Sequence, residues 1–185
     1  MRVLTPSLCR SALAASLALA GCSGEPSGSF TLTLTGPIEG TIRGGATFCR
    51  RPGTGETLLV LRDPDTSAGF LLGRRSPDGV APGSYAVVAA SDSVEGRFWM
   101  ASRLDSLEGG SEYSFRVDEG SVRIISADSS WLRGRINVRM VASDASLEVD
   151  SRTGEIRRLP TEQAGIAGSF TAARAASCDA AEAAG

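Results

Sequence analysis

The stretch Phe30-Thr31-Leu32-Thr33-Leu34-Thr35 decides the fold class of this chain. Hydrophobic residues alternate with threonine along it, so Phe30, Leu32 and Leu34 share one face of an extended strand and the threonines share the other. Alternation with a period of two is typical of a strand that buries one face, and β-branched threonine suits the exposed side. The stretch therefore predicts a half-buried strand in a β-sheet.

Similar short hydrophobic segments recur along the chain, separated by turns rich in glycine, proline and aspartate. The run Leu58-Leu59-Val60-Leu61 is continuously hydrophobic, which indicates a strand buried on both faces. Many short strands at this spacing predict an all-β domain, either an antiparallel β-sandwich or a β-barrel of about ten strands. The expected strands cover residues 30–35, 39–50, 57–62, 68–73, 85–90, 96–103, 111–117, 121–127, 131–143, 147–151, 155–159 and 166–174.

Asp118-Glu119-Gly120 separates two of these segments and predicts the turn of a β-hairpin. Glycine there suits a backbone with positive φ, which hairpin turns require. We therefore expect residues 111–117 and 121–127 to be separate strands that meet at this turn.

The first 21 residues have the composition of an export signal. Arg2 and Arg10 supply positive charge, no acidic residue precedes Glu25, and residues 11–20 are hydrophobic. A short hydrophobic segment between a basic start and small residues is typical of such signals. A helix over this segment would be about 15 Å long, half the thickness of a bilayer core, which is too short for a permanent transmembrane helix.

Leu19-Ala20-Gly21-Cys22 follows the hydrophobic segment directly and resembles the lipobox of bacterial lipoprotein precursors. The resemblance implies cleavage before Cys22, diacylglycerol on its thiol, an acyl chain such as palmitate on its amine, and a membrane anchor in the cell envelope. In enterobacterial lipoproteins a serine in the next position favours the outer membrane, so Ser23 implies that location in a Gram-negative bacterium; a Gram-positive host would make it the plasma membrane. The alternative is ordinary secretory cleavage at Ala18-Leu19-Ala20, which would leave Cys22 as a free thiol.

This assignment divides the chain into four parts. They are residues 1–21, the removed signal; 22–29, the lipidated cysteine and a flexible tether; 30–178, one β domain; and 179–185, a disordered tail. Within the domain, residues 120–173 resemble uncharacterised exported lipoproteins of β type through the strand Gly120-x-Val122-x-Ile124 and the closing run Gly168-Ser169-Phe170. That resemblance implies no activity.

We expect the four cysteines of the chain to differ in their chemical state. Cys9 is removed with the signal and Cys22 takes the lipid, so Cys49 and Cys178 remain as a pair in an oxidising compartment. We expect them to form one disulfide between the first part of the domain and its end. Two buried free thiols are the alternative, and two isolated cysteines are a poor ligand set for zinc.

The absence of two residue types restricts the chemistry of the protein. No histidine and no lysine occurs, and all 19 basic residues are arginine. The chain therefore lacks Ser-His-Asp and Cys-His catalytic groups, the usual histidine-ligated metal sites and Schiff-base chemistry. Hydrolysis by paired carboxylates remains open.

The charge of the chain bears on its partners. Removal of Arg2 and Arg10 with the signal changes the formal net charge from −2 to −4. A negative domain argues against nucleic acid as a partner, because nucleic-acid-binding proteins carry a basic surface.

Arg133, Arg135 and Arg139 are the first candidate ligand-binding group. They alternate with hydrophobic residues in the segment 131–143, so they share its polar face. Such a stripe could hold carboxylates, phosphates or anionic glycans through bidentate contacts. The alternative is a solvated strand face whose arginines pair with nearby acidic residues.

Trp99 and Trp131 are the second candidate group. With Phe98 and Tyr113 they could line a ligand cavity or form a platform for carbohydrate, since aromatic rings combine a large apolar face with a polar edge. The alternative is packing in the core or at the end of a barrel. Phe98 and Trp99 point to opposite faces of a regular strand, so at least one of them is expected at the surface.

Asp63-x-Asp65-x-Ser67-x-Gly69 has the oxygen spacing that begins some calcium loops. Ala68 and Arg74 stand where such loops need glycine and glutamate, so we interpret the stretch as an ordinary turn and expect no metal site. We also expect no cofactor and no catalytic residues.

These observations predict a non-enzymatic binding or structural domain of the cell envelope. Its expected partners are the membrane, through the N-terminal lipid, and an envelope protein, a glycan or a small apolar ligand. One alternative function is a lipocalin-like carrier that holds a small apolar ligand inside a barrel. The other is a carboxylate-dependent hydrolase.

Overall fold

The alternating segments form strands in the computed structural model, which describes residues 28–37, 39–65, 68–92, 94–103, 115–142, 147–149, 156–158 and 163–179. The strands are β1 (Gly28–Thr35), β2 (Gly40–Arg50), β3 (Glu56–Arg62), β4 (Gly69–Arg75), β5 (Gly83–Ala89), β6 (Phe98–Arg103), β7 (Phe115–Ala127), β8 (Trp131–Ala142), β9 (Leu147–Val149), β10 (Ile156–Arg158) and β11 (Gln163–Arg174), and the 3₁₀ turn η1 (Ala90–Asp92) follows β5. None of the helical turns in these ranges is long and apolar enough to cross a membrane. β1 begins at Gly28, so the first two residues of the fold lie in the stretch expected to be tether.

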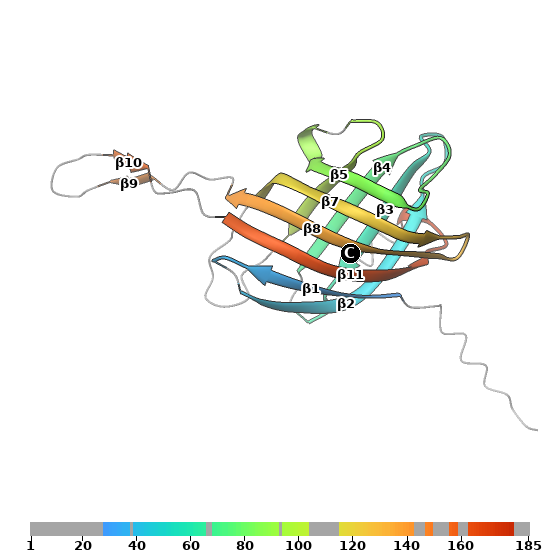
Figure 1. Ribbon diagram of the computed structural model, residues 1–185, viewed down its shortest axis with the longest axis horizontal. Coiled ribbons are helices and arrows are strands. Elements are labelled where there is room, and N and C mark those ends of the chain that lie inside the picture. The colour runs from blue at the N-terminus through green and yellow to red at the C-terminus, as the bar shows by residue number, and fades with distance from the viewer. Residues whose placement is uncertain are drawn as a thin grey trace, which may run out of the picture.

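Nine of these strands close into a barrel (Figure 1). Neighbours round the ring follow the order β1, β2, β3, β4, β6, β5, β7, β8 and β11, and pairing of β11 with β1 completes it. β9 and β10 pair only with each other within the described part of the chain. The all-β prediction is confirmed, and of the two alternatives the barrel is the one that forms.

The barrel is mixed rather than wholly antiparallel. Strand direction reverses at each antiparallel step round a closed ring, so an odd number of strands needs at least one parallel neighbour pair. In this ring of nine the parallel pair is β5 and β6, where Val87 lies beside Phe98. The chain does not return from β5 as a hairpin: β6 pairs antiparallel with β4, and β5 pairs antiparallel with β7. β5 and β6 therefore become neighbours that run in the same direction.

A second parallel contact occurs where β1 begins. Beyond Gly28, β2 and β11 pair directly, with Ala173 beside Thr47. A Cβ atom on Gly28 would lie 2.2 Å from the carbonyl oxygen of Ala46 and 2.3 Å from that of Thr171. The close approach of three strands therefore requires glycine at position 28.

The predicted hairpin at Asp118-Glu119-Gly120 is wrong. Residues 115–127 form the single strand β7, with register shifts against β8 between Val117 and Glu119 and between Ile124 and Ser126. The extra residue is absorbed as a β-bulge, which leaves both acidic side chains exposed on the outside. Gly120 does not adopt positive φ; it allows close pairing, because a Cβ there would lie 2.7 Å from Cα of Val138.

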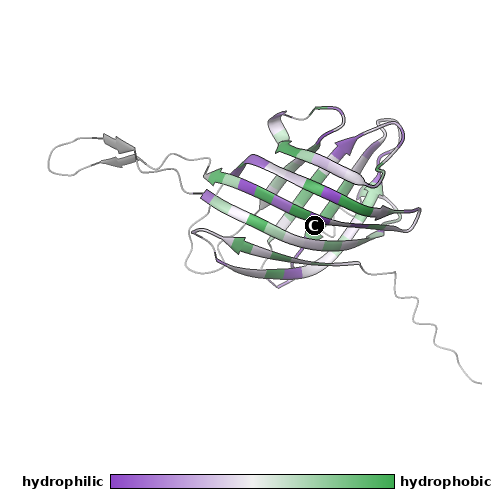
Figure 2. Cartoon of the chain, in the orientation of Figure 1, coloured by the Kyte–Doolittle hydropathy of each residue, from purple (hydrophilic) through white to green (hydrophobic). Residues whose placement is uncertain are grey.

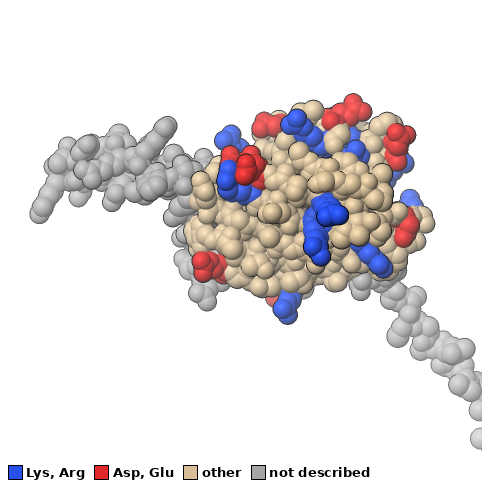
Figure 3. All heavy atoms as spheres, viewed as in Figure 1, with Lys and Arg blue, Asp and Glu red and all other residues tan. Residues whose placement is uncertain are grey.

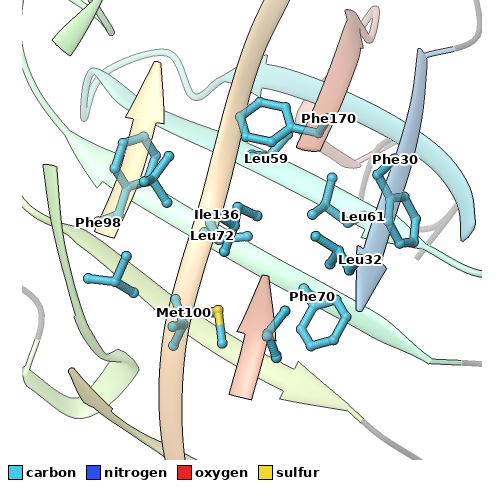
Figure 4. Packing of buried hydrophobic residues seen from close by; sticks show 14 of the residues in the cluster. Phe30, Leu32, Leu59, Leu61, Phe70, Leu72, Phe98, Met100, Ile136 and Phe170 are labelled. Atoms are coloured by element: carbon cyan, nitrogen blue, oxygen red, sulfur yellow. The ribbon is translucent and has the colours of Figure 1, made fainter. Parts of the chain in front are cut away.

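The inside of the barrel is filled by a single cluster of buried hydrophobic side chains (Figure 4). Hydrophobic and polar residues alternate along strands such as β8, as Figure 2 shows, so that one residue in two contributes to the core. On β1, Phe30, Leu32 and Leu34 are buried and every residue between them is exposed, as the alternation predicts. Inside, the ring of Phe170 covers Gly134 on β8, where a Cβ would meet the ring at 2.7 Å.

β3 is buried on both faces, as its continuous hydrophobic run predicts. Leu59 and Leu61 belong to the core of the barrel, whereas Leu58 and Val60 belong to a second cluster outside it. The expected disulfide between Cys49 and Cys178 lies in this outer cluster, with an Sγ–Sγ distance of 2.13 Å. The C-terminal segment therefore crosses the outside of the barrel and shields β3 from water.

Candidate functional site

Three connecting segments meet outside the barrel and line a pocket of about 530 Å³. The volume lies within the range of small-molecule sites. The lining residues come from the β2–β3 turn, the end of β4 and the segment after it, the segment before β6, and β6 itself: Gly53, Thr54, Gly55, Arg75, Ser76, Pro77, Val94, Glu95 and Trp99.

The β2–β3 turn owes its shape to two glycines. Gly53 and Gly55 have φ angles of 87° and 66°, which other residues rarely adopt. The turn is closed by the backbone N–H of Arg51, which donates to the carbonyl oxygen of Glu56 at 2.8 Å. Its backbone conformation brings Thr54 to the pocket and Glu56 to the start of β3.

The indole of Trp99 lies across a neighbouring strand. Trp99 on β6 pairs with Gly73 on β4, and a Cβ on Gly73 would lie 2.2 Å from the indole Cε2 atom. With no side chain in the way, the indole N–H reaches β3 and donates to Oε1 of Glu56 at 2.9 Å. The indole is therefore fixed by a covering contact and by a hydrogen bond to a carboxylate.

Glu56 is a charged residue buried on the outside of the barrel, with only 4% of its surface exposed. Arg51 Nη1 lies 3.3 Å from Oε2, and Arg75 Nε lies 4.0 Å from Oε1. A buried carboxylate is costly unless it is paired and hydrogen-bonded, and these three partners satisfy Glu56. Glu56 thus positions the Trp99 indole and pairs with two guanidinium groups, of which that of Arg75 lines the pocket.

Arg75 offers a cation to the pocket. Its side chain is 64% exposed, and within the described part of the chain its one ion pair is the 4.0 Å contact through Nε. Two terminal guanidinium nitrogens therefore remain for a bidentate contact with a planar anion. Beside it the pocket offers the apolar side chain of Val94 and the polar side chains of Thr54, Ser76 and Glu95.

The structure separates the two tryptophans that the sequence grouped together. Trp131 begins β8, beside Ala173 of β11, and is not among the residues that line the Trp99 pocket. Phe98 is fully buried in the barrel, where its ring packs edge-on against Tyr85 at 5.7 Å. Tyr113 lies outside the described residues. Of the predicted aromatic group, Trp99 alone among the described residues lines this pocket.

The predicted arginine stripe lies on the outer face of β8, but its members differ. Arg139 Nη2 lies 2.9 Å from Asp118 Oδ2 and 3.2 Å from Glu119 Oε1, so its charge is balanced locally. Arg135 instead faces Arg123 of β7. The stripe is therefore neutralised at Arg139, whereas Arg135 faces another cation.

Asp128 stabilises the turn between β7 and β8. The backbone N–H groups of Ser130 and Trp131 each donate to its Oδ1 at 2.8 Å. These two hydrogen bonds lower the pKa of the Asp128 carboxyl below its ordinary value, and the charge of Arg133 adds to the effect. The carboxylate thus caps the tight turn that carries the chain into β8.

The Asp63–Gly69 stretch contains the turn between β3 and β4. The backbone N–H of Asp65 donates to Oδ1 of Asp63 at 2.8 Å, the geometry of an aspartate-stabilised turn. Ser67 lies outside the described residues. In the described ranges no three acidic or cysteine side chains lie close enough together to hold a metal ion.

Sequence reasoning selected Trp99 but missed Glu56 and Arg75. Glu56 has no local signature, because the side chains that pair with it come from the β2–β3 turn, β4 and β6. No protein-family model matches the sequence, and no curated protein or solved structure matches it.

Proposed function

We propose that this protein is an exported, lipid-anchored binding domain of the bacterial cell envelope, held at Cys22 in the outer membrane. The proposal rests on the lipobox-like Leu19-Ala20-Gly21-Cys22 and on the pairing of Cys49 with Cys178. Structural disulfides persist in oxidising compartments outside the cytoplasm. Two or three acyl chains on Cys22 would hold the domain durably at a membrane, whereas one chain would bind marginally.

The ligand that best fits the Trp99 pocket is a saccharide that carries a carboxylate. The observation behind this choice is a fixed indole beside an exposed guanidinium in one pocket. The apolar C–H face of a sugar ring packs on an aromatic ring, and a carboxylate accepts two parallel hydrogen bonds from arginine. Thr54, Ser76 and Glu95 supply groups that can hydrogen-bond to hydroxyls.

The two other candidate functions have less support. A carrier needs space inside the barrel, but there the buried hydrophobic side chains of the described strands pack together as one cluster. A smaller pocket of about 180 Å³ at the barrel end is below the usual size of a ligand site. A carboxylate-dependent hydrolase needs two acids facing one cleft, and Glu95 is the one acid among the described residues that line the Trp99 pocket.

Titration of the lipidated protein with glucuronic-acid oligosaccharides tests this ligand class. In a Trp131→Phe background Trp99 is the only tryptophan, so its fluorescence reports on the pocket and calorimetry gives the affinity. We expect binding of the acidic oligosaccharide, and a loss of about tenfold to hundredfold in affinity on Arg75→Gln, because a charged hydrogen-bonded contact disappears. The neutral glucose oligosaccharide should bind the unaltered protein about as weakly as the acidic one binds Arg75→Gln.

Arg139→Gln is the matched control, because Arg139 is ion-paired on a different strand. It should leave the affinity unchanged, and melting curves check that every variant is folded. No binding of the acidic oligosaccharide, or equal affinity in Arg75→Gln and the parent, would rule out this ligand class.

A further inference from the structure

The outer face of the strands β7, β8, β11, β1 and β2 forms a polar surface separate from the pocket. Three cross-strand rows make up its central part, and we call these fifteen positions the arginine face. The first row is Ser126, Arg133, Thr171, Ser29 and Gly45; the second is Arg123, Arg135, Ser169, Thr31 and Arg43; the third is Ser121, Asn137, Ala167, Thr33 and Thr41.

The arginine face carries four arginines and no acidic residue. Within the described part of the chain, no ion pair involves Arg43, Arg123 or Arg135. Arg123 and Arg135 stand directly opposite each other, an arrangement of like charges that destabilises a sheet. Figure 3 shows basic side chains in the middle of the side that bears β7 and β8, and acidic ones toward its margin.

The remaining residues of the face are small. Apart from the arginines they are serine, threonine, asparagine, alanine and glycine. Short side chains on neighbouring strands leave the surface without bulky projections, so the guanidinium groups can approach a broad surface together. The concentrated positive charge contrasts with the net charge of −4 that the chain has without Arg2 and Arg10.

The start of β1 places this face close to the expected anchor. Ser29 in the first row is the second residue of β1, and Cys22 precedes Gly28 by six residues. Six residues reach at most about 20 Å when fully extended. A lipid on Cys22 would therefore hold the start of β1, beside Ser29 of the first row, within about that distance of the bilayer surface.

We propose that the arginine face docks on the anionic phospholipid headgroups of the membrane that holds the lipid anchor. This inference rests on the anchoring part of the proposed function. Phosphate groups match arginine through bidentate hydrogen bonds, and basic residues are attracted to anionic bilayers. The tether gives the face a high effective concentration at that bilayer, which a polyanion free in solution lacks.

Docking in this way leaves the Trp99 pocket free. Trp99 lies on β6, which is two steps round the ring from β7, the nearest strand of the arginine face, and four from β11 at its centre. The pocket and the arginine face therefore belong to different sides of the barrel. The membrane orients the domain, and the pocket remains open to ligand.

A fluorescent probe on Ser169→Cys tests the docking in the full lipidated protein. The protein is reconstituted in vesicles of phosphatidylcholine, with or without about one third phosphatidylglycerol, and a water-soluble quencher measures the exposure of the probe. We expect the anionic vesicles to shield the probe, and high salt to remove the shielding because the attraction is electrostatic. The combined Arg123→Gln and Arg135→Gln variant should lower the ratio of docked to undocked protein about fivefold for each arginine.

Two controls separate docking from other effects. A probe on Ala101→Cys, exposed on β6, should be quenched equally on both kinds of vesicle. Arg139→Gln should leave the shielding at Ser169 unchanged, because Arg139 is already paired with acidic residues.

Flotation of the same samples distinguishes the two proposals. Protein that floats with the vesicles but has a Ser169 probe equally quenched on neutral and anionic lipid overturns the docking and leaves the anchor in place. The same conclusion follows if the double arginine variant is shielded as well as the parent. Protein that does not float refutes the anchor, and the docking inference falls with it.

Discussion

Replacing Cys49 and Cys178 together with alanine is expected to lower the free energy of unfolding by about 4 to 5 kcal/mol, according to the chain-entropy account of disulfide stabilisation. The two cysteines are 129 positions apart, so the disulfide restricts most of the unfolded chain. Their loss also frees the segment that covers Leu58 and Val60 outside the barrel. Exposure of these side chains adds to the loss.

Urea unfolding followed by far-ultraviolet circular dichroism measures this effect. The parent protein under reducing conditions is the control, and its unfolding midpoint should fall to that of the double variant. A double variant within about 0.5 kcal/mol of the oxidised parent, the range of neutral surface changes, would contradict the role given to the disulfide.

Gly168→Ala is expected to destabilise the protein by about 3 kcal/mol, the upper part of the range for overpacked cores. A Cβ on Gly168 would lie 2.1 Å from the carbonyl oxygen of Thr31 and 2.8 Å from Cα of Leu32. Both atoms are backbone atoms of β1, so they cannot rotate away as a flexible side chain could. The added methyl group therefore strains the β1–β11 pairing that closes the barrel.

Gly45→Ala is the matched control, because a Cβ at Gly45 would have no atom within 4 Å. That variant removes the same conformational freedom from the unfolded chain, and its stability should stay within about 0.5 kcal/mol of the parent. Equal unfolding free energies for the two variants would show that β1 and β11 do not meet as closely as described.

The one-dimensional pattern of the chain predicts most of the strands but not their arrangement. The alternation of hydrophobic and polar residues in β1 and β8 predicts which side chains face a core, and both strands form as expected. A sandwich and a barrel bury the same alternate residues, so the pattern cannot choose between them. Closure depends on contacts between the first and last strands of the barrel, at Gly28 and Gly168, which local periodicity does not encode.

The hairpin turn predicted at Asp118-Glu119-Gly120 does not form, again because of contacts that the local sequence does not encode. Two acidic residues before glycine favour a turn locally, but β8 offers Arg139 as a partner for both carboxylates. The pairing with β8 therefore continues through this point, and the surplus residue becomes a bulge. Tertiary contacts here override the local turn preference.

The candidate site was predictable only in part. Trp99 is conspicuous in the sequence because the chain has few aromatic residues, whereas Glu56 becomes informative only when it is found buried beneath the indole. Arg135 and Arg139 look equivalent in the sequence. They differ in the structure because the bulge in β7 brings acidic side chains to one of them and Arg123 faces the other.

The expected lipid anchor joins the cysteine pairing, the location in the envelope and the orientation on the membrane into one account. Mass spectrometry of the mature N-terminal peptide tests it most directly. We expect a chain that begins at Cys22 and carries the mass of diacylglycerol on the thiol and an acyl chain on the amine. An unmodified Cys22, or a mature chain that begins at Gly21, would contradict it.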